Sequence, residues 1–407
     1  MSIDRLAVVL SLSAIACSHA SRGVSGDDDA TTPDSSVTGD ADPQACAAVA
    51  SFTSERLPGF DAGTWYDGSV LHVGDDAVPH VLVSERSSTS TSGGILEWTR
   101  SATTWDRSGI GGSTTWLEPG AMAATSEDPL CVAYRAHDGT LHIACDGSAD
   151  RTVAPRIDGS LSIVRIGASA GVVYLGQAGA LGGLLWQPFD GGAFDGNPGP
   201  AELVDGDYAN IGTSATAVDG AGDVHVVYEA FGGGARLLYH AVRHAGTWTR
   251  ESIDEDTPAS DGNTPSNTLS LVIDGDTPVI AYGHHATHSV RLARRIGPGT
   301  FDLRTLVTTD PGFPQDLVGR STGLQRDCAG RLLLVYQRSI TTDAHNMGLT
   351  YARVGASGLE DEQHLPQLPN DVTYLHSLGF HVDAAGHQFV SAMVLLGSTP
   401  VLYYASR

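Results

Sequence analysis

The chain has 407 residues, 41% of them hydrophobic and 17% charged, which excludes a disordered chain and a multi-pass membrane protein. Its 49 glycines argue against a helical bundle, because glycine is unfavourable inside helices. The net charge is −24, and the 23 basic side chains are all arginines. A charge of this sign repels polyanions, so no nucleic-acid partner is expected.

The first residues predict export. The apolar run from Leu6 to Ala16 is too short to span a bilayer as a helix. The segment Ala14-Ile-Ala-Cys17 resembles the lipobox of bacterial lipoproteins, which implies a signal peptide over residues 1–16 and lipidation of Cys17. The alternative is an ordinary secretory signal cleaved near Ala20. Both place the mature chain outside the cytoplasm, either secreted or in the bacterial cell envelope, at the outer membrane or cell surface, where a lipid anchor is its sole membrane contact.

Residues 17–45 predict a disordered acidic tether. Segments such as Gly26-Asp-Asp-Asp29 lack the apolar periodicity needed to build a core, and their like charges repel one another. Residues 46–407 then form the folded domain.

A repeat dominates the folded domain. Seven short apolar segments end 50, 40, 54, 54, 54 and 56 residues apart, and each is followed by a strand of alternating pattern. Turns such as Asp219-Gly-Ala-Gly222 precede them, a pattern typical of antiparallel meanders. The apolar segments are Pro79–Ser84, Pro129–Tyr134, Ala170–Tyr174, Asp223–Tyr228, Thr277–Tyr282, Arg331–Tyr336 and His387–Ala392.

The fourth strand of each repeat predicts how the domain closes. It carries an aromatic residue five positions before an aliphatic one, as in Trp248 and Ile253. The chain ends after a third strand, and the missing fourth strand stands at the other end of the domain, at Phe52–Leu57. We therefore predict an all-β, seven-bladed β-propeller of four-stranded antiparallel blades, closed into a ring by the N-terminal strand. Six or eight blades are the alternatives, because the repeat around Val172 is irregular.

The repeats resemble those of the sialidase-like propeller superfamily. The resemblance rests on the pattern Asp-x-x-Gly-x-x-His-Val-Val-Tyr, the segment Leu-x-Tyr-x-Ala-x-Arg and Gly246-Thr-Trp248, and it covers about residues 46–407. It departs from the family's Asp box at Arg243, which stands where the aspartate belongs. Sialidases need an arginine triad and an activated tyrosine, and the first repeat lacks the Arg-Ile-Pro segment that holds the leading arginine. The resemblance therefore implies the fold more strongly than the activity.

The binding site is expected on the face where the loops between strands two and three meet the blade-to-blade loops. Aromatic rings beside carboxylates and arginines suit sugar recognition. The alternative is that these aromatic residues only fill the central channel. The candidate ligand-binding residues, expected around the channel mouth, are Trp65, Tyr66, Glu85, Arg135, Glu229 and His284.

No metal or other cofactor is expected, and no catalytic residue can be named. His284, His285 and His288 form the densest metal-like cluster, but adjacent side chains diverge on a strand, which favours a solvated loop. The sequence favours a monomeric, non-catalytic binding or scaffolding module for a glycan or a protein surface. The alternatives are a glycoside hydrolase or polysaccharide lyase of the same fold, or a structural subunit of an envelope complex.

The cysteines predict two disulfides in an oxidising compartment. Cys131 and Cys145 lie symmetrically about a turn at Asp138-Gly139, so they should face each other on neighbouring strands. Cys46 and Cys328 remain, and we expect them to pair and fasten the N-terminus to the ring.

Overall fold

The structure of the chain is a computed structural model. All described residues belong to the unit Ala41–Arg407, the second of the two units of the chain. The structure describes residues 51–407 except for 60–63, 88–92, 111–121, 127, 137, 147, 167–168, 208–210, 233, 257–268, 309–317, 320, 340–346, 367–371 and 397–398. Within these residues, no helix is long and apolar enough to cross a membrane.

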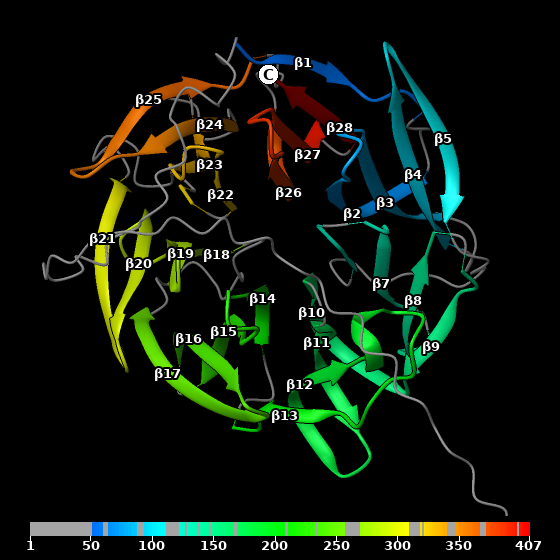
Figure 1. Cartoon of the computed structure of the whole chain (residues 1–407). Helices are drawn as coiled ribbons and strands as arrows, with labels where there is room; N and C mark the ends of the chain where they lie inside the picture. The colour runs from blue at the N-terminus through cyan, green and yellow to red at the C-terminus, as the bar shows by residue number, and fades with distance from the viewer. Residues whose placement is uncertain are drawn as a thin grey trace, which may run out of the picture. The chain divides into compact units, whose positions relative to one another are not determined.

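Seven four-stranded antiparallel sheets, the blades, surround a central channel (Figure 1). Blade 1 contains β2 (Thr64–Val73), β3 (Pro79–Ser87), β4 (Gly93–Ser101) and β5 (Thr104–Ile110). Blade 2 contains β6 (Met122–Ala124), β7 (Cys131–Arg135), β8 (Leu141–Cys145) and β9 (Arg151–Ala154). Blade 3 contains β10 (Arg156–Ile166), β11 (Ser169–Ala178), β12 (Leu181–Pro188) and β13 (Glu202–Asp205). In every blade the first strand named is the innermost.

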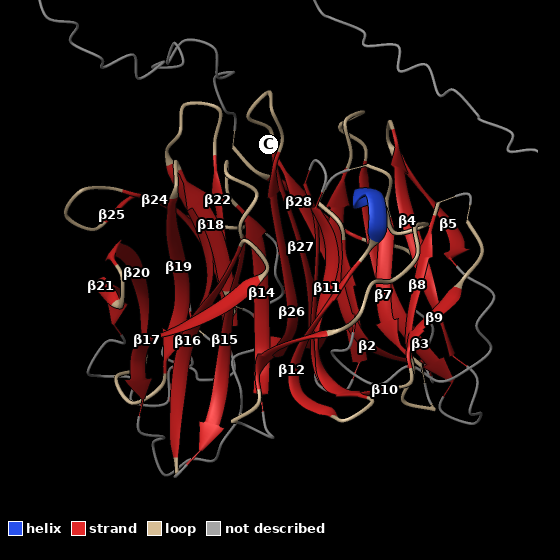
Figure 2. Cartoon of the chain, turned by 60° about the horizontal axis from the view of Figure 1, so that its bottom comes forward, coloured by secondary structure: helices blue, strands red, loops and turns tan. Residues whose placement is uncertain are grey.

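Blade 4 contains β14 (Ile211–Val218), β15 (Val224–Gly232), β16 (Ala235–His244) and β17 (Thr247–Asp256). Blade 5 contains β18 (Ser270–Asp274), β19 (Thr277–His284), β20 (Ser289–Gly297) and β21 (Thr300–Thr308). Blade 6 contains β22 (Thr322–Arg326), β23 (Leu332–Ser339), β24 (Met347–Val354) and β25 (Leu359–His364). A single 3-10 turn, Asp190–Gly192, interrupts the strands of the described chain (Figure 2).

Blade 7 joins the two ends of the domain, as the repeat predicts. It contains β26 (Val372–Val382), β27 (Gln388–Leu396), β28 (Thr399–Ser406) and, as its outermost strand, β1 (Thr53–Arg56). β1 pairs antiparallel with β28, with Thr53 opposite Ser406, and the backbone N–H of Leu57 extends the contact by donating to the carbonyl of Leu402. The predicted fold class, the count of seven blades and the N-terminal closure are confirmed.

The recurring Asp-x-x-Gly turn connects the first and second strands of several blades. In blade 4, Oδ1 of Asp219 accepts hydrogen bonds of 2.9 Å from the backbone N–H groups of Ala221 and Asp223. Gly222 has a φ of +86°, which glycine adopts without the steric cost of a side chain. Asp327 and Asp383 accept equivalent bonds in blades 6 and 7, so the motif is a repeated side-chain cap of the turn.

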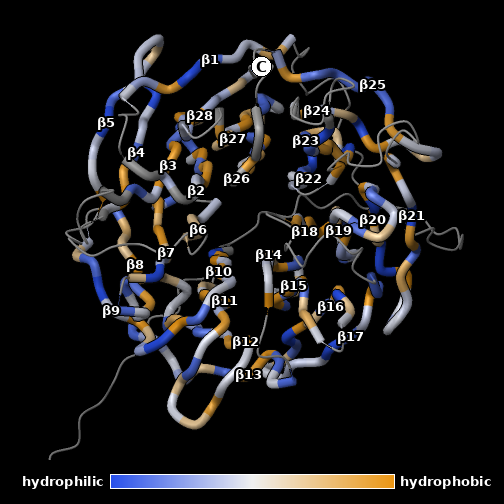
Figure 3. Tube along the Cα trace, turned by 180° about the vertical axis from the view of Figure 1, so that it is seen from behind, coloured by the Kyte–Doolittle hydropathy of each residue, from blue (hydrophilic) through white to orange (hydrophobic). Residues whose placement is uncertain are grey.

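The core lies between the blades. Seven clusters of buried apolar side chains occur among the described residues, one at each seam between neighbouring blades. The second strand of a blade is covered on both faces, so it is mostly apolar, and Val224–Ala230 is wholly buried, including its polar residues His225 and Glu229. Outer strands alternate or are mostly polar, as Figure 3 shows by the hydrophilic colouring of β25.

Blade 3 explains the irregular repeat length. The outer strand of blade 2 ends at Ala154, and the inner strand of blade 3, β10, begins at Arg156. The connection between these blades is therefore the single residue Pro155, and together with the short strands β8 and β9 it makes the 40-residue step.

A disulfide joins the second and third strands of blade 2. Cys131 and Cys145 face each other in the register of β7 and β8 and are bonded, with their Cα atoms 4.0 Å apart. Cys328 is also disulfide-bonded. Cys17 and Cys46 lie outside the described residues, so the predicted Cys46–Cys328 pair stays a prediction.

Candidate functional site

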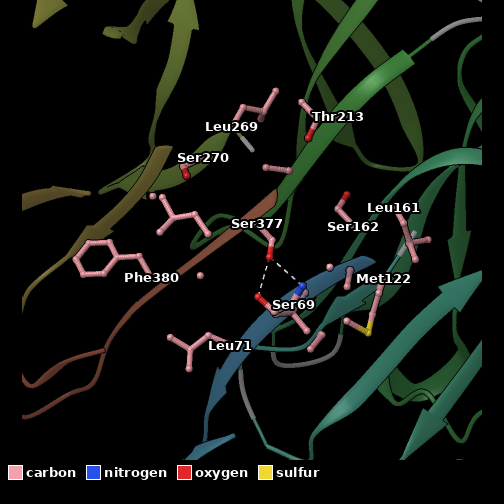
Figure 4. Close-up of a pocket in the computed structure, with 18 of the residues that line it drawn as sticks. Ser69, Leu71, Met122, Leu161, Ser162, Thr213, Leu269, Ser270, Ser377 and Phe380 are labelled. Carbon is pink, nitrogen blue, oxygen red and sulfur yellow. Dashed lines mark hydrogen bonds between the residues drawn. The ribbon is translucent and has the colours of Figure 1, made fainter. Parts of the chain in front are cut away.

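The central channel contains a cavity of about 340 Å³, within the usual range for small-ligand sites. The inner strands of all seven blades contribute to its wall (Figure 4). The wall mixes small hydroxyl side chains with aliphatic ones such as Leu71 and Leu161. None of the described residues lining the cavity carries an acidic, basic, imidazole or phenol group.

The hydroxyl groups recur around the channel at the period of the blades. Ser162, Ser214, Ser270, Thr322 and Ser377 come from the inner strands of blades 3 to 7, at intervals of 52, 56, 52 and 55 residues. These hydroxyl residues were not predicted from the sequence, because the candidates chosen there were charged and aromatic residues of the loops. A polar residue that returns at the repeat period inside otherwise apolar inner strands is the signal that could have identified them.

Several of these hydroxyls link neighbouring inner strands. The hydroxyls of Ser69 and Ser377 lie 2.7 Å apart across the seam where the ring closes (Figure 4). The Ser270 hydroxyl donates to the carbonyl of Thr322 at 2.7 Å, and Ser162 and Ser214 are 3.1 Å apart. A hydroxyl has one donor and two acceptor positions, so one such contact does not use its full hydrogen-bonding capacity.

The predicted ring of six ligand-binding side chains around the channel mouth is not what the structure shows. None of the six is among the residues that line the cavity. Tyr66 is buried in the seam between blades 7 and 1, so its ring belongs to the core. Trp65 lies opposite Arg86 in the register of β2 and β3, and its side chain is outside the described part of the chain.

Glu229 and His284 are buried as well. Glu229, 1% exposed, lies 3.6 Å from the guanidinium of Arg236 in the same blade. His284 is 7% exposed, and its Nδ1 lies 2.8 Å from the hydroxyl of Thr287. Other side chains of the protein therefore surround these two polar groups, and neither lies at the channel mouth as the sequence predicted.

Glu85 and Arg135 are partly exposed, each near the end of the second strand of its blade. Glu85 accepts a 3.2 Å hydrogen bond from Arg107 on the outer strand of blade 1. These two residues are the members of the predicted set whose described side chains remain accessible.

His284 ends β19, and His285 and His288 lie in the turn that follows it. No group of histidine, cysteine or acidic residues in the described chain could hold a metal ion. At this turn, Asp256 instead accepts backbone hydrogen bonds from His285 at 2.5 Å and from Ala286 at 2.9 Å. Asp256 thus fixes the turn that follows His284.

Two arginines near the end of a third strand make ion pairs across a seam between blades. Arg243 of blade 4 makes two hydrogen bonds, of 2.7 and 2.8 Å, with Glu202 of blade 3. Arg295 of blade 5 makes an equivalent pair with Glu251 of blade 4, at 2.8 and 2.7 Å. Bidentate pairs of this geometry are the stronger kind of ion pair, so these arginines join blades.

No family model matches the chain, and no curated protein matches it. Solved structures do match in fold. A puromycin-hydrolysing peptidase of Mycobacterium tuberculosis is 10% identical with a TM-score of 0.50, over 81% of this chain and 49% of that chain.

Two further solved structures are similar to a lower degree. A Trypanosoma rangeli sialidase is 9% identical with a TM-score of 0.46, over 87% of this chain and 59% of that chain. An Aleuria aurantia lectin is 10% identical with a TM-score of 0.44, over 85% and 92%. At these identities the likeness is one of fold alone, and the class that the fold defines is the seven-bladed β-propeller.

Proposed function

We propose that the protein is a non-catalytic binding module whose ligand is an uncharged, hydroxyl-rich group, such as the end of a neutral glycan, held in the central channel. The observation that carries this proposal is the lining of the cavity, where hydroxyl side chains recur from blade to blade without an ionisable neighbour among the described residues. Hydroxyls can both donate to and accept from sugar hydroxyls, and the aliphatic side chains between them can contact C–H faces.

The lining disfavours a charged ligand. A buried carboxylate or phosphate needs a cationic partner to offset the loss of its water, and the described wall offers none. The partly exposed Glu85 and Arg135 are proposed as rim contacts for the part of the ligand outside the channel.

The described residues of the channel wall do not favour the alternative of a glycoside hydrolase. Glycoside hydrolysis in most families needs two carboxyl groups about 5 to 10 Å apart around the sugar. The described wall of the channel holds no carboxyl group. Release of reducing sugar in the experiment below would favour this alternative.

A glycan panel tests the proposal, with calorimetry on the hits. Thr213 lines the channel and Thr249 is exposed on the outer strand of blade 4, so Thr213→Trp fills the channel and Thr249→Trp is its control. We expect wild type and Thr249→Trp to bind a neutral glycan and Thr213→Trp to lose it. Equal binding by all three proteins would contradict the channel as the site.

We also propose that the mature protein is held at the bacterial envelope by a lipid on Cys17, with residues 17–45 as a spacer. The support is the lipobox-like segment and the acidic composition of the spacer. The mass of the mature N-terminal peptide tests it. A diacylated cysteine is expected, and an unmodified N-terminus near residue 21 would favour plain secretion.

A further inference from the structure

A line of five hydrogen-bonding side chains runs through blade 4 to blade 5, away from the channel. Nε2 of His225 lies 3.2 Å from Oδ2 of Asp219, and Nδ1 of His225 lies 3.0 Å from Nε2 of His240. Nδ1 of His240 lies 3.3 Å from Oε2 of Glu251, which Arg295 of blade 5 holds from the other side. Each of the three contacts that involve a histidine requires one proton.

The carboxyl groups of Asp219 and Glu251, which flank the two histidines, can only accept hydrogen bonds, because both are ionised. The hydrogen bonds from Arg295, helped by the backbone N–H of Gly299, outweigh burial and lower the pKa of Glu251 to about 2. Burial acts to raise the pKa of Asp219, but hydrogen bonds from the Asp223 N–H and from His225 outweigh it, so that this pKa is also lowered. All three protons must therefore come from the two imidazole rings.

Two neutral imidazoles carry only two N–H protons between them. We propose that His225 and His240 form a buried proton-binding site that holds one extra proton and carries a single positive charge. His225 then donates from both ring nitrogens, to Asp219 and to Nε2 of His240, and His240 donates from Nδ1 to Glu251. This inference goes beyond the proposed function and does not depend on it.

The surroundings agree with this assignment. His225 and His240 are 4% and 0% exposed, so bulk water cannot reach these contacts and donate a hydrogen bond in place of a missing N–H group. Their ring planes are 12° apart and their centroids are 5.2 Å apart, so the two rings meet edge to edge, as an N–H···N bond in the ring plane requires. The ring of Phe301 in blade 5 packs edge-on against His240 at 5.9 Å. Burial, and then the charge of the His225 ring, lower the pKa of His240 to about 4, which makes His240 the neutral member of the pair.

The charges along the line then balance. The described charged groups that face the pair are Asp219 from the turn before β15, Glu251 from β17 and Arg295 from β20. With the extra proton on the histidine pair, the negative charges of Asp219 and Glu251 alternate along the line with the positive charges of the pair and of Arg295. Loss of that proton leaves one contact without a hydrogen and a net negative charge inside the seam of blades 4 and 5, which weakens this seam.

NMR of the uniformly ¹⁵N-labelled wild-type protein at pH 7 tests the proton count. A ¹⁵N–¹⁵N coupling across the 3.0 Å contact identifies the pair among the 16 histidines without any variant. We expect three of the four ring nitrogens to carry a proton and Nε2 of His240 to carry none. Two protonated and two unprotonated nitrogens, or no coupling between the rings, would overturn the proposal.

A variant gives a second readout. His225→Gln removes the neighbouring charge, so the titration midpoint of His240 should move upward from its low value. The matched control is His244→Gln, on the same strand as His240, because His244 is 76% exposed and its ion pair is with Asp223. A His240 midpoint that does not move in His225→Gln would show that His225 carries no charge and would overturn the assignment.

Discussion

The phenol hydroxyl of Tyr228 donates a 2.5 Å hydrogen bond to Oδ2 of Asp205, and the two residues belong to different blades. Arg250 of blade 4 holds the other oxygen of Asp205 at 2.8 Å. One blade further on, Tyr282 donates to Asp254 at 2.6 Å, and Arg291 holds the same Oδ2 atom at 2.8 Å. Burial, followed by the adjacent carboxylate, raises the pKa of Tyr228 and of Tyr282, so both phenols are donors at any physiological pH. The seams around blade 4 are therefore fastened by polar groups as well as by apolar packing.

Removing the Tyr228 hydroxyl should weaken its seam. Tyr228→Phe leaves Asp205 without one donor, and we expect a loss of about 1–2 kcal/mol in the free energy of unfolding. The matched control is Tyr174→Phe at the equivalent position of blade 3, where the buried hydroxyl has no partner among the described residues. Chemical denaturation measures both, and an equal loss in the two variants would contradict the role of the Asp205 bond.

The closing strand should be essential for a cooperative fold. Deleting residues 46–58 removes β1, which leaves the edge of β28 unpaired and uncovers the apolar seams on either side of blade 7. We expect aggregation or loss of a cooperative thermal transition, whereas trimming residues 18–40 should change neither. A protein truncated at residue 58 that melts like the full domain would disprove the closure.

The architecture could be predicted from the sequence because the signals of the blade repeat are local. The apolar second strands, the capping aspartates such as Asp219 and the aromatic residue of the fourth strand each depend on a few neighbouring residues. The site was not predictable in the same way. Glu229 and His284 were expected near the channel mouth because they follow apolar strands, but both side chains are buried. Glu229 lies beside Arg236 of its own blade, and His284 lies 3.8 Å from Asp256 of blade 4. The side of the sheet toward which a side chain points at the end of a strand depends on β-bulges and on partners from distant parts of the chain.

Acid should destabilise the protein through His240. The pKa of this histidine is lowered to about 4 in the folded state, against about 6.5 in an unfolded chain. The unfolded chain binds more protons between these values, so the stabilisation is complete above about pH 6.5 and is lost as the pH falls toward 4. Between pH 7 and pH 4.5, we expect the free energy of unfolding to fall by roughly 2–3 kcal/mol more in the wild type than in His240→Gln, as measured by chemical denaturation at both pH values. The exposed His244→Gln control should retain the wild-type acid sensitivity, and a wild-type pH profile in both variants would refute the assignment.

The blade 2 disulfide should contribute to stability. Cys131 and Cys145 are 14 residues apart in the chain, and closing a loop of that size is worth about 3 kcal/mol in the chain-entropy model. We expect a double substitution of both cysteines by alanine to lower the free energy of unfolding by up to this amount. Peptide mapping of the unreduced protein should recover the Cys131–Cys145 pair and identify the partner of Cys328, for which Cys46 is predicted. Free thiols at both Cys131 and Cys145 would contradict the pairing.

The most direct measurement is a crystal structure of the protein with the tightest-binding neutral glycan of the panel. We expect one sugar ring inside the central channel, hydrogen-bonded to hydroxyls that recur from blade to blade, such as those of Ser162 and Ser270. A ligand bound between blades on the outer surface, with the channel unchanged, would contradict it.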